Sequence, residues 1–295
     1  MGLKSFHSAM WLLFVFILPL SNAYAGSNLH LKAKSAILMN MNDGTILYSQ
    51  NPDRPIQPAS ITKVLSLYLV YEALTEGRAH MDDLVTISKN AWRTRGSRMY
   101  VKAGRQIPLE DLIKGMAVVS GNDACVAVAE HFGGVDKFVE MMNNKARELG
   151  MTNSRFKNPN GLPAKGQVTT ARDVLKLSRQ YLNRFPESLS IHSMRYFTYG
   201  DVTQRNHNRL LQRCSDVDGL KTGYVRAAGY HIVATAKRGD VRLIAVVMGS
   251  KNPYIRTRET RMLLEEGFRM VQHRYPAVKN AHARLPGTHR GYVPS

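Results

Sequence analysis

Short apolar runs bounded by turn residues occur near both ends of the chain. Residues 35–39 and 45–48 flank an Asn-Asp-Gly turn, a combination that is typical of a β-hairpin. Residues 230–237 and 242–248 flank an Arg-Gly-Asp turn in the same way. The pattern therefore predicts one hairpin near each end of the chain.

Helical spacing dominates between these hairpins. No helix breaker interrupts the stretch from Ser60 to Glu76, and Gly77 follows as a plausible C-terminal cap. Apolar residues cover nearly every face of this helix, so it is predicted to lie in a core. Further helices are predicted at residues 108–119, 122–131, 136–149, 169–183 and 255–272, with a break at Ser120-Gly121 between the first two.

This order of elements predicts an α+β fold. Strands from both ends of the chain would form one antiparallel β-sheet flanked by helices. An all-helical lobe, about residues 78–165, would be inserted between the sheet-forming ends of a domain that spans residues 26–275. No internal repeat is present.

The first 25 residues have the pattern of a secretory signal peptide. Lys4 precedes an apolar run from Met10 to Leu20, and Ala23-Tyr24-Ala25 fits a cleavage site before Gly26. An uncleaved anchor is the alternative, but the run is shorter than the roughly 20 residues that span a bilayer. We therefore expect export to the periplasm or cell-wall space, as a soluble or peripherally membrane-associated protein.

The net charge indicates which kinds of binding partner to expect, and the cysteine content limits the disulfide bridges. The formal net charge is +19, which favours anionic partners. Export and the lack of a zinc-finger or stacking-aromatic motif argue against nucleic acid, so an anionic wall polymer or membrane surface is the better expectation. The tail, residues 276–295, is polar and basic and is expected to be disordered. Two cysteines exclude a disulfide scaffold; Cys125 is expected as a buried thiol, although one bridge to Cys214 stays open.

Ser60 and Lys63 are the first candidate catalytic pair. At a spacing of three residues they lie on the same face of the predicted helix, one turn apart. Because that helix is apolar all round, Lys63 should lose water, and Lys221 would add a like charge nearby. Both effects lower a lysine pKa, as a general base for Ser60 requires.

Two more segments carry candidate chemistry. Ser120 lies at the helix break, where its hydroxyl can point into a cleft, and Asn122 can fix neighbouring side chains or a substrate amide. Lys221-Thr222-Gly223 is predicted on a strand that borders the cleft. There it offers a positive charge, a hydroxyl donor and a glycine that admits a substrate backbone. Each segment alone has an ordinary structural explanation as a cap, a turn or a strand end.

Together, the three segments resemble the Ser-x-x-Lys, Ser-x-Asn and Lys-Thr-Gly motifs of penicillin-binding proteins. Their order is similar to that of the low-molecular-mass D-alanyl-D-alanine carboxypeptidases. Residues 158–163 (Asn-Pro-Asn-Gly-Leu-Pro) and 218–223 (Asp-Gly-Leu-Lys-Thr-Gly) extend the likeness, which covers roughly residues 33–272. The resemblance implies a β-lactamase/transpeptidase-like fold.

The resemblance also implies roles. Ser60 would attack the carbonyl between two D-alanines of a peptidoglycan stem peptide, Lys63 would take its proton, and Ser120 would relay a proton to the leaving amine. Backbone N–H groups of Ser60 and Tyr224 would form the oxyanion hole. Carboxylate binding would fall to Lys221, Thr222 and Arg256, with Arg226, Arg258 and Arg261 as competitors for the last position. No metal or cofactor is implied, and β-lactams would be covalent inhibitors.

Several alternatives remain. Relatives often carry His where this chain has Tyr224, and the chain stops soon after its last helix, a length seen in D,D-endopeptidases that cut cross-links. A β-lactamase is disfavoured by Ser-Gly-Asn and by the lack of a Glu-x-x-Leu-Asn segment. A binding sensor that has lost hydrolysis is the non-enzyme alternative.

Overall fold

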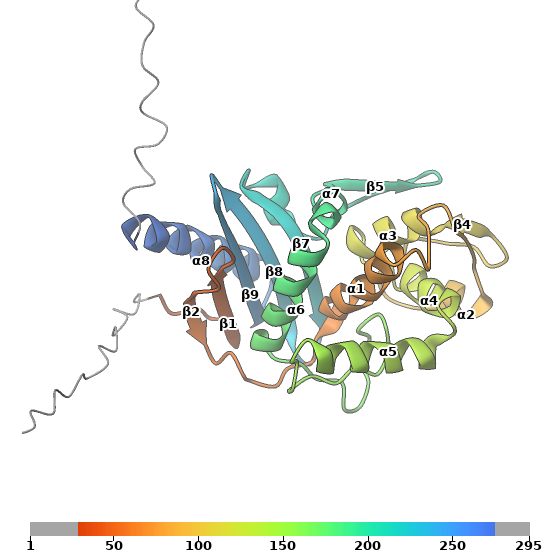
Figure 1. Cartoon of the computed structure of the whole chain (residues 1–295), viewed down its shortest axis with the longest axis horizontal. Coiled ribbons are helices and arrows are strands. Elements are labelled where there is room, and N and C mark those ends of the chain that lie inside the picture. The colour runs from red at the N-terminus through yellow and green to blue at the C-terminus, as the bar shows by residue number, and fades with distance from the viewer. Residues whose placement is uncertain (1–28, 275–295) are drawn as a thin grey trace, which may run out of the picture.

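In the computed structural model, which describes residues 29–274, a five-stranded antiparallel sheet has helices on both faces (Figure 1). Strand β1 from the start of the chain pairs with β9 from its end, so the sheet joins both ends as predicted. The predicted α+β fold is confirmed. The strand order is β2 (Ile46–Gln50), β1 (Ser35–Asn40), β9 (Val241–Ser250), β8 (Gly229–Arg238) and β7 (Val217–Val225).

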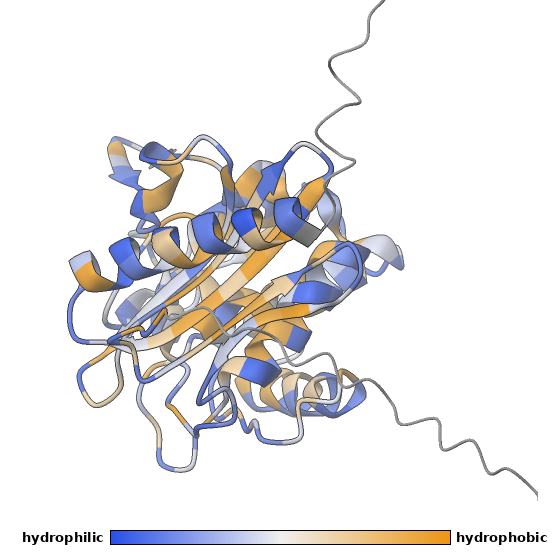
Figure 2. Cartoon of the chain, turned by 90° about the vertical axis from the view of Figure 1, so that its left-hand side faces the viewer, coloured by the Kyte–Doolittle hydropathy of each residue, from blue (hydrophilic) through white to orange (hydrophobic). Residues whose placement is uncertain are grey.

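The central strand β9 is buried on both faces, and its residues alternate between two cores. On one face it packs against α8 (Pro253–Arg274), which crosses the sheet in Figure 2. On the other face it packs against α6 (Ala171–Arg184). The first core includes Leu243, Ala245 and Val247, and the second includes Ile244, Val246 and Met248.

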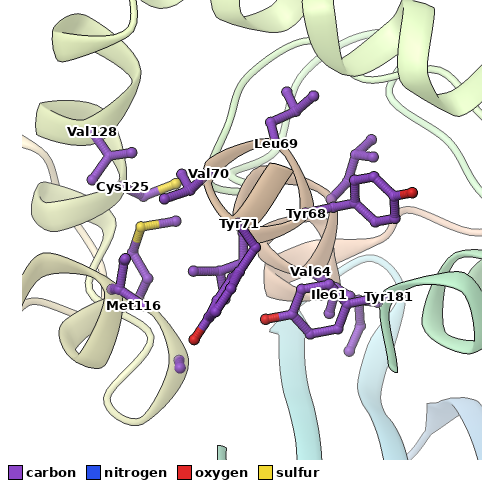
Figure 3. Packing of buried hydrophobic residues seen from close by; sticks show 14 of the residues in the cluster. Ile61, Val64, Tyr68, Leu69, Val70, Tyr71, Met116, Cys125, Val128 and Tyr181 are labelled. Carbon is purple, nitrogen blue, oxygen red and sulfur yellow. The ribbon is translucent and has the colours of Figure 1, made fainter. Parts of the chain in front are cut away.

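Helix α1 (Thr62–Thr75) lies beside α6, on the opposite side of the sheet from α8 (Figure 1). Its first twelve residues are all buried, which explains why its apolar positions follow no single face. In Figure 3, Tyr68 and Tyr71 lie toward Tyr181 of α6, while Val70 lies toward Cys125. A short 3₁₀ turn, η1 (Ala59–Ile61), precedes α1, so Ser60 lies just outside the α-helix rather than in its first turn.

The helices between α1 and α6 form the second part of the molecule. The predicted break is confirmed between α3 and α4, and Thr170 caps α6 by accepting a hydrogen bond from Asp173 N. These helices are α2 (Lys89–Arg93), α3 (Leu109–Ala117), α4 (Asn122–His131) and α5 (Val135–Glu148).

Short elements were not predicted. Two small two-stranded sheets occur, and the second of them leads into the residues that cover one side of the cleft. They are β3 (Leu84–Thr86) with β4 (Gln106–Pro108), and β5 (Tyr196–Tyr199) with β6 (Val202–Arg205). The remaining elements are η2 (Pro186–Ser188), α7 (Leu189–His192) and η3 (Arg209–Gln212).

The predicted signal peptide and basic tail lie outside the described residues. Between residues 29 and 274, no helix is long and apolar enough to cross a membrane. Cys125 and Cys214 are free thiols, and Cys125 is fully buried as expected, with its thiol directed at Pro159 O.

Candidate active site

A cleft of about 710 Å³ lies where η1, β7 and the start of α4 meet. All three motifs contribute to its lining, through Ser60, Ser120 with Asn122, and Thr222 with Gly223. Gln204 and Arg205 at the end of β6, and Asn206, His207 and Arg209 after it, also line the cleft. The tertiary structure thus brings together segments that lie far apart in the sequence, from Ser60 to Arg256.

Lys63 is held so that its lone pair can face Ser60. Its Nζ lies 2.7 Å from Asn122 Oδ1, 2.7 Å from the carbonyl oxygen of Asn160 and 3.2 Å from Ser60 Oγ. A neutral amine has two N–H donors and one lone pair. Because both carbonyl oxygens can only accept, they take the two donors, and the lone pair is left for the Ser60 hydroxyl.

The orientation of Asn122 is fixed from its other end. Its Nδ2 donates to Arg95 O at 2.7 Å, which directs Oδ1 at Lys63. Of the two roles predicted for this residue, the structure shows the first, since both ends of its amide contact protein groups. Its neighbour Asp123 accepts hydrogen bonds from the backbone N–H groups of residues 99–101 and so ties that loop to the start of α4.

Burial lowers the pKa of Lys63 to about 8, while Cys125 and Asp123 act in the opposite direction. Burial and the positive charge of Lys63 also hold the pKa of Lys221 well below its ordinary value. The combination of desolvation and like charge that was predicted for Lys63 is found at Lys221 instead. At Lys63, desolvation is the main cause. A pKa of about 8 leaves roughly a tenth of Lys63 neutral near pH 7, enough for a general base.

Ser120 combines backbone strain with an unpaired hydroxyl. Its φ is 62°, in the left-handed region that costs a non-glycine residue about 1 kcal/mol. Its Oγ is buried and makes no hydrogen bond to any other described residue. An unpaired buried hydroxyl costs a further 1–3 kcal/mol or so. Since Ser120 lines the cleft, the fold keeps this hydroxyl in place for a ligand.

Gly223 has a structural reason beside the predicted one, which was to admit a substrate backbone. A Cβ at this position would lie 3.0 Å from Ser60 N and 3.0 Å from Ala59 Cβ, which is closer than side chains ordinarily pack. The glycine therefore lets the edge strand β7 pack directly on η1, which carries Ser60. This contact fixes the Lys221-Thr222-Gly223 segment beside the serine.

Lys221 and Arg256 place positive charge at the cleft. Lys221 is buried and its Nζ donates to Thr222 O at 3.1 Å. Arg256, from α8, lines the cleft, and burial and the charge of Arg209 lower its pKa to about 10. Its Nε is buried without a hydrogen-bond partner among the described residues. The competing arginines do not line this cleft: they are Arg226, Arg258 and Arg261.

Tyr224 lines the mouth of the cleft and remains 52% exposed. Its ring stacks on that of Tyr230, with centroids 4.2 Å apart and an interplanar angle of 28°. Tyr224 and Tyr230 are paired across β7 and β8, so the strand register sets this stack. This chain therefore offers a stacked phenol ring at this edge of the cleft.

His231 is a residue that the sequence did not indicate. It pairs with Gly223 across β8 and β7, and its Nδ1 accepts a hydrogen bond from Gly249 N at 2.9 Å. The proton must then lie on Nε2, which donates to Gln57 O at 3.0 Å. Burial keeps this imidazole neutral by lowering its pKa to about 4. His231 thus ties the loop before Ser60 to the sheet.

A larger depression, about 1120 Å³, lies between η3 and α8, but it contains none of the three motifs. Its charged groups are largely paired with one another, such as Arg238 with Asp216 and Glu265. The smaller cleft, which contains the three motifs, is therefore the candidate active site, and the larger depression is not. Within residues 29–274, no group of three or more His, Cys, Asp or Glu side chains is arranged to hold a metal ion.

The fold and the cleft together define the class of transpeptidase-like, penicillin-binding serine enzymes. Residues 22–252 match the family model described as D-alanyl-D-alanine carboxypeptidase, and the chain belongs to this family of serine peptidases.

Two relatives show how close the likeness is. D-alanyl-D-alanine carboxypeptidase DacC of Escherichia coli is 42% identical over 248 residues, which are 81% of this chain and 62% of that protein. A D-alanyl-D-alanine endopeptidase of Pseudomonas aeruginosa is 32% identical over 248 residues, 80% of this chain and 78% of the relative. The chain therefore spans less than two thirds of the length of the E. coli carboxypeptidase.

Solved structures agree with the fold. Penicillin-binding protein 5 of Haemophilus influenzae superposes with a TM-score of 0.80 and 40% identity, over 82% of this chain and 72% of that one. Penicillin-binding protein D2 of Listeria monocytogenes, determined in an ampicillin-bound form, gives a TM-score of 0.76 and 31% identity, over 82% and 99% of the two chains.

Proposed function

We propose that this protein is a serine-type D-alanyl-D-alanine carboxypeptidase that removes the terminal D-alanine from peptidoglycan stem pentapeptides. The observation that carries the proposal is the geometry of Lys63. Two carbonyl acceptors occupy its N–H groups, and its lone pair is left for Ser60. Similarity to carboxypeptidases along 81% of the chain supports the same activity.

In the first half-reaction, Lys63 takes the Ser60 proton as Oγ bonds to the carbonyl carbon between the two D-alanines. The carbonyl oxygen gains negative charge, which the N–H groups of Ser60 and Tyr224 stabilise; one such donor lowers the barrier by about 3 kcal/mol. The C–N bond then breaks. The leaving amine takes a proton through Ser120, whose hydroxyl is otherwise unpaired among the described residues.

Lys221, Thr222 and Arg256 hold the carboxylate of the terminal D-alanine. Lys221 and Arg256 are buried cations, and neither forms an ion pair with an acidic residue that the structure describes. A buried charge without a counter-ion is costly, so an anionic substrate group relieves that cost on binding. In the second half-reaction, water replaces D-alanine and hydrolyses the acyl-enzyme to free Ser60.

β-Lactams would acylate Ser60 by the same steps, since their ring amide presents the same carbonyl and carboxylate. The ampicillin-bound form of the Listeria protein supports this. The predicted signal peptide supports action outside the cytoplasmic membrane. The +19 formal charge supports contact with anionic wall polymer or membrane surface.

Cleavage of cross-links is the second candidate function, because an endopeptidase is 32% identical to this chain. Mass spectrometry of muropeptides separates the two. Pentapeptide monomers and cross-linked dimers are digested with the purified protein. Loss of one alanine from monomers, with dimers intact, supports the carboxypeptidase. Conversion of dimers to monomers supports the endopeptidase, and no change in either sinks both.

A further inference from the structure

The loop that joins β3 to β4, residues 87–105, carries positive charge only. We call it the basic loop; it contains no Asp, Glu or His, and its cations are Lys89, Arg93, Arg95, Arg98, Lys102 and Arg105. Among the residues that the structure describes, Arg98 alone of this set forms an ion pair, with Asp123 at 3.7 Å. The other cations of the loop are exposed and have no acidic partner between residues 29 and 274. Such an excess of one sign favours an anionic ligand.

The basic loop is closed at its base and anchored from inside. Ile87 N donates to Arg105 O, and Gly104 N donates to Ile87 O, each at 2.8 Å, so the two ends of the loop lie side by side. The apolar side chains that the loop buries are Ala91, Met99 and Val101. The exposed cations are therefore carried by a fixed backbone, and a ligand can bind them without first ordering the loop.

Two exposed aromatic rings lie in the same loop. Trp92 is 41% exposed and Tyr100 is 52% exposed. Arg98 connects them, because its Nη2 donates to Trp92 O and its guanidinium lies 5.8 Å from the centre of the Tyr100 ring. The φ of Tyr100 is 70°, a left-handed conformation that is unusual for an aromatic residue. Trp, Tyr and Arg contribute most of the energy at many binding interfaces, so the loop has the composition of a binding surface.

The basic loop also forms part of the cleft wall. Gly96 and Ser97, in the middle of the loop, line the cleft, and Arg95 and Arg98 directly precede and follow them. The carbonyl oxygen of Arg95 accepts the hydrogen bond from Asn122 Nδ2 at 2.7 Å. The cationic surface therefore begins at the edge of the cleft and extends the area that a long substrate can contact.

We propose that the basic loop binds the peptidoglycan strand to which the reacting stem peptide is attached. The inference rests on the proposed function and adds a preference for polymeric substrate over free peptide. Peptidoglycan supplies both kinds of complementary group: stem peptides without cross-links end in carboxylates, which pair with the arginines and lysines, and sugar rings present apolar C–H faces to Trp92 and Tyr100. Each exposed ion pair is weak and screened by salt, so the loop acts through several contacts at once.

The test compares the release of D-alanine from two substrates. One is a free pentapeptide that ends in D-alanyl-D-alanine, and the other is a soluble glycan strand that carries the same pentapeptide without cross-links. The ratio of kcat/KM, strand over free peptide, is measured within each variant, so a general loss of activity cancels. In the wild type, this ratio should exceed one and fall as salt is raised.

Arg93→Gln combined with Lys102→Gln removes two exposed cations of the basic loop that do not line the cleft. The ratio should fall by about fivefold, the value of two exposed ion pairs. Lys137→Gln combined with Arg147→Gln is the matched control, because it removes two exposed cations from α5 and should leave the ratio unchanged.

Trp92→Ala should also lower the ratio, whereas Met262→Ala, a similarly exposed side chain on α8, should not. Equal ratios in the loop variants and their controls overturn the inference while leaving the proposed function intact. Loop variants that keep the ratio but lose affinity for vesicles containing phosphatidylglycerol show that the loop binds a membrane, which overturns the inference as well. No release of D-alanine from the free pentapeptide by the wild type overturns the proposed function, and the inference with it.

Discussion

The start of α1 and the edge strand β7 each contribute one buried lysine to the cleft, and the two lysines have different surroundings. Lys63 contacts three oxygen atoms, on Ser60, Asn122 and Asn160. Lys221 donates to one acceptor among the described residues, the carbonyl oxygen of Thr222. Both side chains are almost completely excluded from solvent, so burial alone does not distinguish them.

The number of acceptors does distinguish them. Two carbonyl groups satisfy the N–H donors of Lys63 in its neutral form, so this lysine is suited to exchange a proton with Ser60. Lys221 has donors to spare, and a bound carboxylate supplies the missing acceptors. The same residue type, buried to the same extent, is therefore suited to act as a base in one wall and to hold an anion in the other.

The largest expected effect is at the nucleophile itself. Ser60→Ala removes the atom that forms the acyl bond, so labelling by a fluorescent penicillin should vanish while the melting temperature stays within a few degrees of the wild type. Ser190→Ala, an exposed serine on α7, is the matched control and should label normally. Persistent labelling of Ser60→Ala would show that another residue is the nucleophile.

Lys63→Met tests the base. Loss of general-base catalysis should slow acylation by a β-lactam by about 100- to 10,000-fold in stopped-flow or gel-based assays. Lys137→Met, an exposed lysine on α5, should acylate at the wild-type rate. If Lys63→Met acylates as fast as this control, then Lys63 is not the base and the contrast between the two lysines fails.

Stability should separate the two lysines in the absence of ligand. Lys63→Met leaves Asn122 Oδ1 and Asn160 O without their donor, at about 1–3 kcal/mol for each buried group. Lys221→Met frees a single carbonyl and removes a desolvated cation. In urea unfolding, Lys221→Met should therefore be more stable than Lys63→Met by about 2 kcal/mol. If Lys63→Met were instead the more stable of the two variants, the proposed difference between the surroundings of the two lysines would be wrong.

The pH dependence sharpens the role of Lys63. Because its folded pKa is about 8, acylation should rise about tenfold per pH unit below 8 and level off above it. For stability, the unfolded chain with a pKa of 10.5 binds more protons at Lys63 between about pH 8 and 10.5, so this group makes unfolding free energy rise with pH there. An acylation rate that is flat from pH 6 to 9 would show that a neutral Lys63 is not required.

The smallest expected effect is at the exposed end of β7. Tyr224→His replaces the aromatic face with an imidazole but leaves the backbone N–H in place, so kcat/KM for a D-alanyl-D-alanine peptide should change by only about two- to fivefold. Tyr254→His, an exposed tyrosine at the start of α8, is the control. A loss above a hundredfold would give the Tyr224–Tyr230 stack a larger part in substrate binding than the structure suggests.

Much of the fold could be predicted because its long elements carry local signals. The Asn-Asp-Gly turn set the first hairpin, and the uninterrupted stretch ending before Gly77 set α1. The short elements β3 to β6 were missed, because three- and four-residue strands hold too few positions to show a period. The start of α1 shifted by two residues, because η1 places Ser60 in a 3₁₀ turn against β7.

The residues of the cleft fall into the same two groups: those that a local sequence signal marks and those that none marks. Three short motifs identified the residues that line the cleft, because their chemistry is specific and their order is fixed by the chain. The cleft residues between Gln204 and Arg209 were not predicted, because no motif marks that segment. The hydrogen bonds of His231 could not be predicted from the sequence, because its partners Gln57 and Gly249 are distant in sequence.

The sequence by itself determined which groups are available: a serine, two lysines and an arginine, carried by elements whose apolar patterns make them buried. Only the tertiary structure decided what each of them does. A hydrogen bond or a pKa depends on the few atoms within about 4 Å, and here those atoms come from segments far apart in the chain. Lys63 is suited to act as a base because Asn122 and Asn160 accept its N–H groups, and a side chain at Gly223 would be crowded because η1 packs beside its Cα.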